Sequence, residues 1–335
     1  MRSIGIIGAG TMGCEITHIA AIAGMDVRVS DADAEHAAMG RDRALALGAR
    51  LVERGRLEEA DAHAAAGRIH PVGSVADLAP VDVVIEAVPE DLALKTAVHR
   101  QLDDVVRPDA LVATNTSGLS VTALADATRS PGRVIGLHFF NPASVMSLVE
   151  VIAGAATSED TVSRAITLAG DLGKTPVRVR ECPGFVVNRV LVRAMAEAYR
   201  ASAGAPVERE GADRAVVDGG PAPMGPFALG DLVGLDVLES IRGDLEAAYG
   251  DRFADAGTLA PLVAAGHLGR KSGGGLLPGT GGGGSGAEPV VAAVYYAAAL
   301  DEARRLADEG VAAPDDIDLA MRLGAGWTQG PLAAG

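Results

Sequence analysis

The first 155 residues alternate between short apolar runs and longer amphipathic stretches. Six of the runs are apolar on both faces, which is typical of buried parallel strands. These runs cover residues 4–7, 27–30, 83–87, 111–114, 134–137 and 148–152. Helical periodicity fills the intervals between them, most clearly over residues 11–24, 91–106 and 159–172. The alternation predicts an α/β fold built on a doubly wound parallel sheet.

The pattern changes after Cys182-Pro183-Gly184, where the strand-like runs end. Helical periodicity then covers residues 185–203, 211–218, 226–248 and 256–265. We therefore expect a sheet domain over residues 1–182 and an all-α helical C-terminal domain over residues 183–278. Within the first domain, residues 34–66 are longer than one crossover helix needs. They are rich in Ala, Arg and Glu and predict a helical hairpin insertion that stands off the sheet.

A Gly-rich linker over residues 279–287 precedes a final segment, residues 288–335, that resembles part of the helical domain. A shift of 105 residues aligns the two segments without a gap. The shift pairs Glu197-Ala198 with Glu302-Ala303, Arg200 with Arg305, Asp213 with Asp318, Ala215 with Ala320 and Gly225-Pro226 with Gly330-Pro331. Chance similarity between Ala-rich helices is the alternative explanation. The Gly-Pro pair and the aspartate favour a partial repeat.

The chain of 335 residues carries 29 Lys and Arg against 44 Asp and Glu, a formal net charge of −15. This charge repels phosphate backbones and anionic lipids, so we expect neither nucleic acid nor a membrane as a partner. Apolar stretches reach only about ten residues, too few to span a bilayer. The two cysteines cannot form a disulfide scaffold, and no histidine has metal-ligand spacing. We expect a cytoplasmic protein without a metal.

A glycine motif, Gly8-x-Gly10-x-x-Gly13, follows the first predicted strand and opens a helix near Thr11 and Met12. The glycines would allow a tight turn, the approach of a pyrophosphate and close packing of helix on strand. The helix N-terminus would supply N–H groups for the phosphates. Asp31 ends the second strand, 18 residues beyond Gly13, where a carboxylate accepts bonds from a ribose 2′-hydroxyl and repels a 2′-phosphate. The motif predicts a Rossmann-type domain that binds NAD.

The aspartate has a second interpretation as a helix cap, a role that Asp33 could fill instead. Small polar residues also close a later strand at Thr114-Asn115-Thr116-Ser117-Gly118. Ends of parallel strands face the ligand crevice, so Ser117 is a candidate site residue. The alternative is an ordinary turn before a helix.

A histidine and a glutamate interrupt two apolar strands. His138 ends the run over residues 134–137, and Glu150 lies twelve residues on within Leu148-Val149-Glu150-Val151. A buried carboxylate is costly unless paired, and the two residues could satisfy each other if their strands are adjacent. A histidine held by a buried acid is suited to act as a general base. A histidine buried only for packing is the alternative.

The second domain begins with Pro183-Gly184-Phe185-Val186-Val187-Asn188-Arg189. Asn188 would lie one turn into the first helix, and it would be on the face turned toward the first domain if the helix packs there. A solvent-facing asparagine is the alternative.

Taken together, these motifs resemble the L-3-hydroxyacyl-CoA dehydrogenases, especially the short bacterial 3-hydroxybutyryl-CoA type. Further matches are Glu86-Ala87-Val88-Pro89-Glu90, Gly136 to Pro142, Thr175-Pro176 and Met224-Gly225-Pro226-Phe227. The resemblance places Ser117, His138, Glu150 and Asn188 at the family's active-site positions. It places Glu90, Lys95, Asn115 and Asn141 beside the nicotinamide, and Arg54 and Arg56, in the hairpin, near the CoA moiety.

The resemblance implies NAD-dependent oxidation of a short 3-hydroxyacyl-CoA, or the reverse reaction, in a homodimer formed through the helical domain. A carrier-protein thioester or a free hydroxy acid is an alternative substrate, and a non-catalytic nucleotide-binding protein is a further alternative. Two departures affect the acyl pocket and the interface: Leu276-Leu277 replaces an aromatic pair, and residues 211–223 lack the usual acidic segment. Ala293 stands where the repeat would carry Asn188, so the second copy should have no chemistry.

Overall fold

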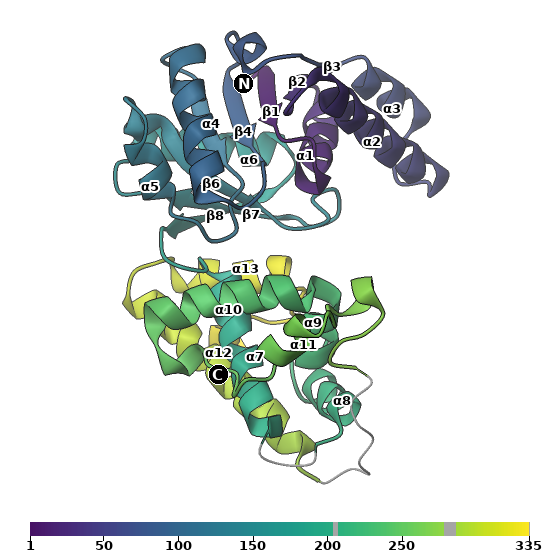
Figure 1. The fold of residues 1–335 in the computed structure, drawn as a ribbon, viewed down its shortest axis with the longest axis vertical. Coiled ribbons are helices and arrows are strands. Elements are labelled where there is room, and N and C mark those ends of the chain that lie inside the picture. The colour runs from purple at the N-terminus through teal and green to yellow at the C-terminus, as the bar shows by residue number, and fades with distance from the viewer. Residues whose placement is uncertain (204–206, 278–285, 335) are drawn as a thin grey trace. The chain divides into compact units, whose positions relative to one another are not determined.

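The computed structural model describes residues 1–203, 207–277 and 286–334 (Figure 1). The chain divides into two compact units, Met1–Glu181 and Cys182–Gly335. Most of the predicted linker, residues 279–285, lies outside the described residues. No helix in the described part of the chain is both long and apolar enough to cross a membrane.

The first unit is built on an eight-stranded sheet with the order β3-β2-β1-β4-β5-β6-β7-β8. Its strands are β1 (Ser3–Ile7), β2 (Asp26–Ser30), β3 (Ile69–Pro71), β4 (Val83–Glu86), β5 (Leu111–Thr114), β6 (Val134–Phe139), β7 (Leu148–Ala153) and β8 (Thr175–Arg180). Strands β1 to β6 are parallel. The predicted α/β class with a Rossmann-type sheet is confirmed.

The far end of the sheet differs from the prediction. β7 runs antiparallel to β6, although it was expected to be parallel, and it pairs in parallel with β8. Strands β3 and β8 were also missed, because neither is apolar on both faces. β3 has three residues, two of them exposed, and β8 alternates buried valines with exposed Arg178 and Arg180, as suits an edge strand.

Helices cover both faces of this sheet (Figure 1). They are α1 (Thr11–Ile22), α2 (Ala34–Glu53), α3 (Glu59–Ala66), α4 (Leu92–Val105), α5 (Val121–Asp126) and α6 (Glu159–Asp171). The three long predicted helices are confirmed within two residues at each end. Asp91 and Ser158 cap α4 and α6 by accepting backbone N–H groups, which explains where these helices begin.

The predicted hairpin forms α2 and α3, and Asp33 caps α2. The prediction that the hairpin stands off the sheet is wrong for α2, which packs on α1, β2 and β3. Small residues allow this close packing: a Cβ on Gly40 would come 2.3 Å from the Cβ of Ala9. Ala37, Ala44 and Gly48 complete the buried face.

The second unit is helical, and its described residues contain no strand. Its helices are α7 (Val187–Ala203), α8 (Arg209–Gly219), α9 (Pro226–Val233), α10 (Leu235–Tyr249), α11 (Ala260–Ala264), α12 (Glu288–Asp308), α13 (Pro314–Gly324) and α14 (Pro331–Ala334). The helix expected over residues 226–248 is divided at Gly234, whose φ of 103° ends α9. The helix expected over residues 256–265 is shorter in the structure, where α11 covers only Ala260–Ala264.

The partial repeat is visible in the hydrogen bonds of this unit. Asp213 accepts the first two N–H groups of α9 at 3.0 and 2.8 Å. Asp318 accepts the first two N–H groups of α14 at 2.8 and 2.9 Å. A Cβ at Gly225 or at Gly330 would collide with the respective aspartate. The same glycine–aspartate arrangement therefore recurs at a spacing of 105 residues. α12 packs along α7 and α8 of its own chain.

Candidate active site

The glycine motif forms a tight turn between β1 and α1. Gly8 has a φ of 95°, and a Cβ there would meet the backbone of Ala87 at 2.6 Å. A Cβ on Gly13 would lie 1.7 Å from the carbonyl oxygen of Gly8, so only glycine lets the helix approach the strand. Around Gly10, by contrast, a Cβ would meet nothing within 4 Å. The turn thus leaves open space at the glycine where a pyrophosphate would approach.

α1 begins directly at this turn, at Thr11 and Met12. Its N-cap is Gly10, and no side chain caps the first turn. The N–H groups and the helix dipole are therefore presented to a ligand rather than to a capping side chain. This local arrangement suits a dinucleotide phosphate despite the negative charge of the chain.

Asp31 lies at the end of β2, next to the same turn. One carboxylate oxygen accepts the N–H of Ala9, and the other accepts the N–H of Ala32 at 2.6 Å. Asp33 caps α2, so Asp31 is not the helix cap. The carboxylate therefore holds the glycine turn in place.

Glu86 is a buried carboxylate near Glu90 that the sequence argument did not single out. It ends β4, is 0% exposed and accepts bonds from Lys95 Nζ at 2.7 Å and from Thr114 Oγ1 at 2.8 Å. Burial alone would raise the pKa of Glu86, but contacts with His99, Lys95 and Thr114 hold it below its ordinary value. The available signal was a carboxylate in an apolar strand, the feature that identified Glu150.

Glu90 connects this cluster to the loop that carries Ser117. Its Oε1 accepts the hydroxyl of Thr116 at 2.5 Å and the backbone N–H of Ser117 at 2.9 Å. Its Oε2 lies 3.3 Å from Lys95 Nζ. Lys95 was expected beside the nicotinamide, but its side chain is only 1% exposed and lies between Glu86 and Glu90. In this structure Lys95 supports Glu90 and, through it, the Ser117 loop.

The two asparagines predicted beside the cofactor have different surroundings. Asn115 is nearly buried, and its Oδ1 accepts the backbone N–H of Phe139 at 2.9 Å, which joins the ends of β5 and β6. Asn141 is exposed in the loop after β6 and precedes a cis proline, Pro142. Both residues lie at the carboxyl edge of the parallel strands.

His138 and Glu150 are direct cross-strand partners on β6 and β7. The imidazole Nδ1 lies 2.7 Å from Glu150 Oε2. Glu150 is 0% exposed and His138 is 5% exposed. The ring of Phe140 lies 4.5 Å from the imidazole, centroid to centroid. β6 and β7 are therefore adjacent antiparallel strands, and this adjacency satisfies the condition under which the sequence predicted that His138 and Glu150 would pair. With Nδ1 bonded to the acid, Nε2 is the nitrogen suited to exchange a proton with a substrate.

The remaining predicted residues lie elsewhere in the two units. Arg54 and Arg56 are exposed in the loop between α2 and α3. Asn188 is the second residue of α7 in the second unit. Its neighbour Arg189 was missed by the sequence argument, although it is fully buried in an ion-pair cluster.

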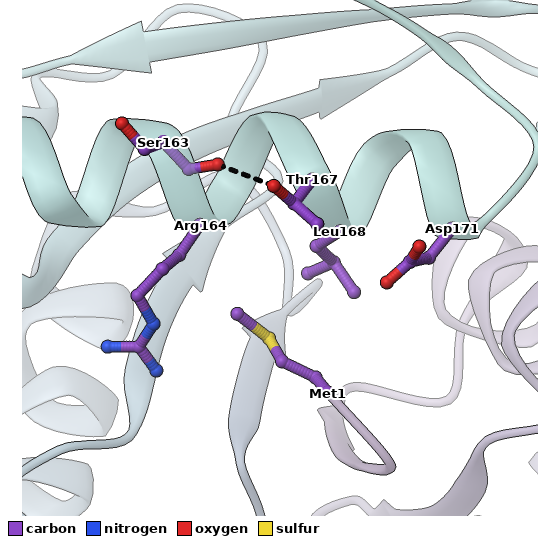
Figure 2. A pocket seen from close by; sticks show the side chains of 6 residues that line it. All are labelled: Met1, Ser163, Arg164, Thr167, Leu168 and Asp171. Atoms are coloured by element: carbon purple, nitrogen blue, oxygen red, sulfur yellow. Dashed lines mark hydrogen bonds between the residues drawn. The ribbon is translucent and has the colours of Figure 1, made fainter.

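A surface pocket of about 330 Å³ lies on α6, away from all of these residues (Figure 2). Its lining comprises Met1, Ser163, Arg164, Thr167, Leu168 and Asp171. Thr167 Oγ1 donates within the helix to the carbonyl of Ser163 at 3.0 Å. None of the predicted site residues lines it. Among the described residues, no group of three His, Cys, Asp or Glu side chains is placed to hold a metal ion.

Comparison with known proteins identifies the family. The model of the 3-hydroxyacyl-CoA dehydrogenase NAD-binding domain matches residues 3–182. The model of the C-terminal domain of the same dehydrogenases matches residues 184–278 and again residues 291–335. The chain belongs to the 3-hydroxyacyl-CoA dehydrogenase family. The family resemblance drawn from the motifs is confirmed, and the second match covers the predicted partial repeat.

The similar proteins include dehydrogenases of the same family. A probable 3-hydroxybutyryl-CoA dehydrogenase of Bacillus subtilis (strain 168) is 41% identical over 276 residues, which cover 82% of this chain and 96% of that protein. A 3-hydroxyadipyl-CoA dehydrogenase of Escherichia coli (strain K12) is 40% identical over 82% of this chain and 58% of that protein. The crystal structure of a 3-hydroxybutyryl-CoA dehydrogenase from Escherichia coli K12 has a TM-score of 0.91 and 31% identity. It covers 99% of this chain, and the match spans 90% of that chain.

Proposed function

We propose that this protein oxidises a short (S)-3-hydroxyacyl-CoA, similar to 3-hydroxybutyryl-CoA, to the 3-oxoacyl-CoA with NAD, or catalyses the reverse reaction. The observation that carries the proposal is the His138–Glu150 pair, 2.7 Å apart at the carboxyl edge of the sheet. β1 ends at the same edge and leads into the glycine turn. A base and a dinucleotide cradle at one edge suit hydride transfer from an alcohol. The family and the named relatives support the thioester substrate.

In this mechanism, His138 Nε2 takes the proton of the 3-hydroxyl group while hydride leaves C3. Bound NAD supplies the hydride acceptor. Glu150 keeps the imidazole in one tautomer and stabilises the imidazolium, because its carboxylate is buried beside Nδ1. The hydroxyl of Ser117 and the amide of Asn188 would bond the reacting oxygen or the thioester carbonyl and fix the reactive geometry. Glu90 would hold Ser117 for this role through the backbone N–H bond.

The cofactor would be held by the glycine turn and the start of α1. Gly8, Gly10 and Gly13, with the N–H groups of Thr11 and Met12, would bind the pyrophosphate, and Asp31 would bind the ribose. Glu90, Lys95, Asn115 and Asn141 would shape the nicotinamide side. Lys95 would act there through Glu90, since its ammonium group is buried.

Arg54 and Arg56 would attract the phosphates of CoA. Both are exposed in the loop between α2 and α3, so their guanidinium groups are accessible to a ligand. We also propose that the protein acts in the cytoplasm and forms a homodimer through its helical domain. Because α12 already packs along α7 and α8, a dimer would use other surfaces of that domain.

A substrate panel tests this proposal. The purified chain is mixed with NAD and with 3-hydroxyacyl groups of several lengths, each as the CoA thioester, the carrier-protein thioester and the free acid. NADH formation measured by absorbance should be fastest with the short CoA thioesters. Faster turnover of the carrier-protein thioester or the free acid would replace the substrate assignment. NADH formation from none of them would favour a non-catalytic nucleotide-binding protein.

A further inference from the structure

A buried ion-pair cluster joins α12 to the first turn of α7. Arg189 is 0% exposed, and its Nε donates to Glu302 Oε1 at 2.7 Å. Its two terminal nitrogens donate to the two oxygens of Glu309, each at 2.7 Å. Glu302 is in α12, and Glu309 directly follows that helix. Both carboxylates therefore come from the C-terminal segment, whereas the cation belongs to the first copy of the repeat.

An aromatic and a basic side chain, Tyr249 and Arg252, also contact this ion-pair cluster. The guanidinium carbon of Arg189 lies 4.2 Å from the ring centre of Tyr249, and Nη1 donates to the tyrosine oxygen at 3.1 Å. Arg252 Nε donates to the second oxygen of Glu302 at 3.0 Å. Burial alone would lower the pKa of Arg189, but the bonds to Glu309 and Glu302 raise it above its ordinary value. Arg189 therefore keeps its positive charge, and we call Arg189 together with Glu302 and Glu309 the clamp.

The turn that this clamp adjoins has an unusual backbone. Gly184 and Phe185 both have positive φ, 77° and 51°, although phenylalanine rarely adopts this conformation. Phe185 is 1% exposed. The backbone N–H of Arg189 donates to the carbonyl of Gly184 at 3.0 Å. Strained conformations of this kind persist only where the surrounding structure holds them. The packing of Phe185 and the clamp on Arg189 hold this turn from both ends.

Asn188 lies between the strained turn and the clamped arginine. We propose that Glu302 and Glu309 are positioning residues for Asn188, so that the C-terminal segment influences the reaction through Asn188 without contributing a reacting group. The inference rests on the proposed function, which gives Asn188 its contact with the substrate. The segment has Ala293 where the repeat would carry a second Asn188, and it supplies carboxylates to the first copy instead.

The substitution Glu302→Gln tests this proposal, because it keeps the shape of the side chain and removes its charge. We expect kcat/KM for the best 3-hydroxyacyl thioester to fall about tenfold, since small misplacements of a positioning group slow a reaction strongly. The Kd for NADH should not change, because the cofactor residues belong to the other unit. The matched control is Asp301→Asn, the preceding residue, whose partner Arg305 lies on the exposed side of α12. This control should keep the kinetics of the parent chain.

A double-mutant cycle separates positioning from general destabilisation. In an Asn188→Ala background, Glu302→Gln should cause little further loss of kcat/KM, because the group that it positions is gone. If Glu302→Gln does not fold, Glu309→Gln replaces it, since that side chain is 41% exposed. Unchanged kcat/KM in the folded single variant, or losses that multiply in the double variant, would overturn the inference. Unchanged kinetics for Asn188→Ala alone would overturn the proposed role of Asn188, and the inference with it.

Discussion

Glu150 in the sheet and Glu302 in α12 are both 0% exposed, and both lie 2.7 Å from a basic partner. Their partners differ in chemistry. Glu150 faces the imidazole of His138, a group that can serve as a proton acceptor or a proton donor. Glu302 faces the guanidinium of Arg189, which keeps its charge at any pH that the protein meets. Under the proposed function, a buried acid supports proton transfer in the first unit, whereas a buried acid in the second unit fixes the geometry of its partner.

This comparison separates two effects of neutralising a buried acid. Beside the imidazole, the loss should fall mainly on the chemical step. Beside the guanidinium, the loss leaves the buried cation with Glu309 as its one remaining acidic partner, so it should affect folding and the placement of neighbouring residues. Measurements of turnover, of the Kd for NADH and of the melting temperature distinguish the loss of Glu150 from the loss of Glu302.

His138→Gln should give the largest effect. Turnover should fall by roughly two to four powers of ten, the usual contribution of a general base. NADH binding, measured by fluorescence titration, should persist, because no cofactor-binding group is removed. Turnover close to that of the parent chain would exclude His138 as the base and would leave Glu150 without a role in proton transfer.

Removal of residues 287–335 should have the second largest effect. It deletes both carboxylates of the Arg189 cluster and exposes the face of α7 that α12 covers. Loss of the partners of a buried charge typically costs about 3–5 kcal/mol of unfolding free energy. We expect a lower melting temperature, intact NADH binding and a changed number of subunits, measured by light scattering. A truncated chain with the subunit number and the melting temperature of the parent would show that the segment has no part in assembly or stability.

Glu150→Gln should slow turnover by about one to three powers of ten, less than the loss of the base itself, because the imidazole remains but its protonated form is no longer stabilised. Glu150→Gln should lower the melting temperature less than Glu302→Gln does. Equal effects of Glu150→Gln and Glu302→Gln on both turnover and melting would remove the distinction between the two acids.

Asp213 is a third buried carboxylate, and it accepts two backbone N–H groups. Burial raises its pKa to about 6, from 3.8 in the unfolded chain. Between pH 4 and pH 6 the carboxyl of Asp213 is therefore protonated more often in the folded state than in the unfolded state. The contribution of Asp213 to the free energy of unfolding should fall by about 2 kcal/mol as pH rises from 4 to 6. Chemical denaturation across this range should show a smaller fall for Asp213→Asn. An identical pH dependence in both chains would show that this carboxyl does not titrate there.

Asp31→Ser should give the smallest effect, about tenfold or less. The half-buried carboxylate of Asp31 is placed to bind a ribose hydroxyl, so its loss should weaken NAD binding and narrow the preference for NAD over NADP. Kd values for both reduced cofactors measure the preference. An unchanged ratio would leave Asp31 only its bonds to Ala9 and Ala32.

Local patterns explain what the sequence could predict. The strand before the glycine motif, the helix after it and the change to helices near residue 183 depend on nearby residues, and the structure has all three. The 105-residue repeat was also visible because its aspartates and glycines have local roles at the start of α9 and α14. The reversed direction of β7 was not visible, since an apolar strand reads the same in either orientation.

A residue whose partners are distant in the sequence was missed. Arg189 resembles a solvated helix residue until Glu302 is placed against it, 113 positions later. His138 and Glu150 were paired correctly because each was anomalous in its own strand.

A crystal structure of the protein with NAD and a short 3-oxoacyl-CoA would test the role of His138 as the base, because it locates the reacting oxygen. We expect His138 Nε2 within about 2.6–3.2 Å of the 3-oxygen, with Nδ1 still bonded to Glu150. We also expect Ser117 or Asn188 within hydrogen-bond distance of that oxygen or of the thioester carbonyl. A 3-oxygen held by other groups, with His138 turned away from the ligand, would exclude His138 as the base.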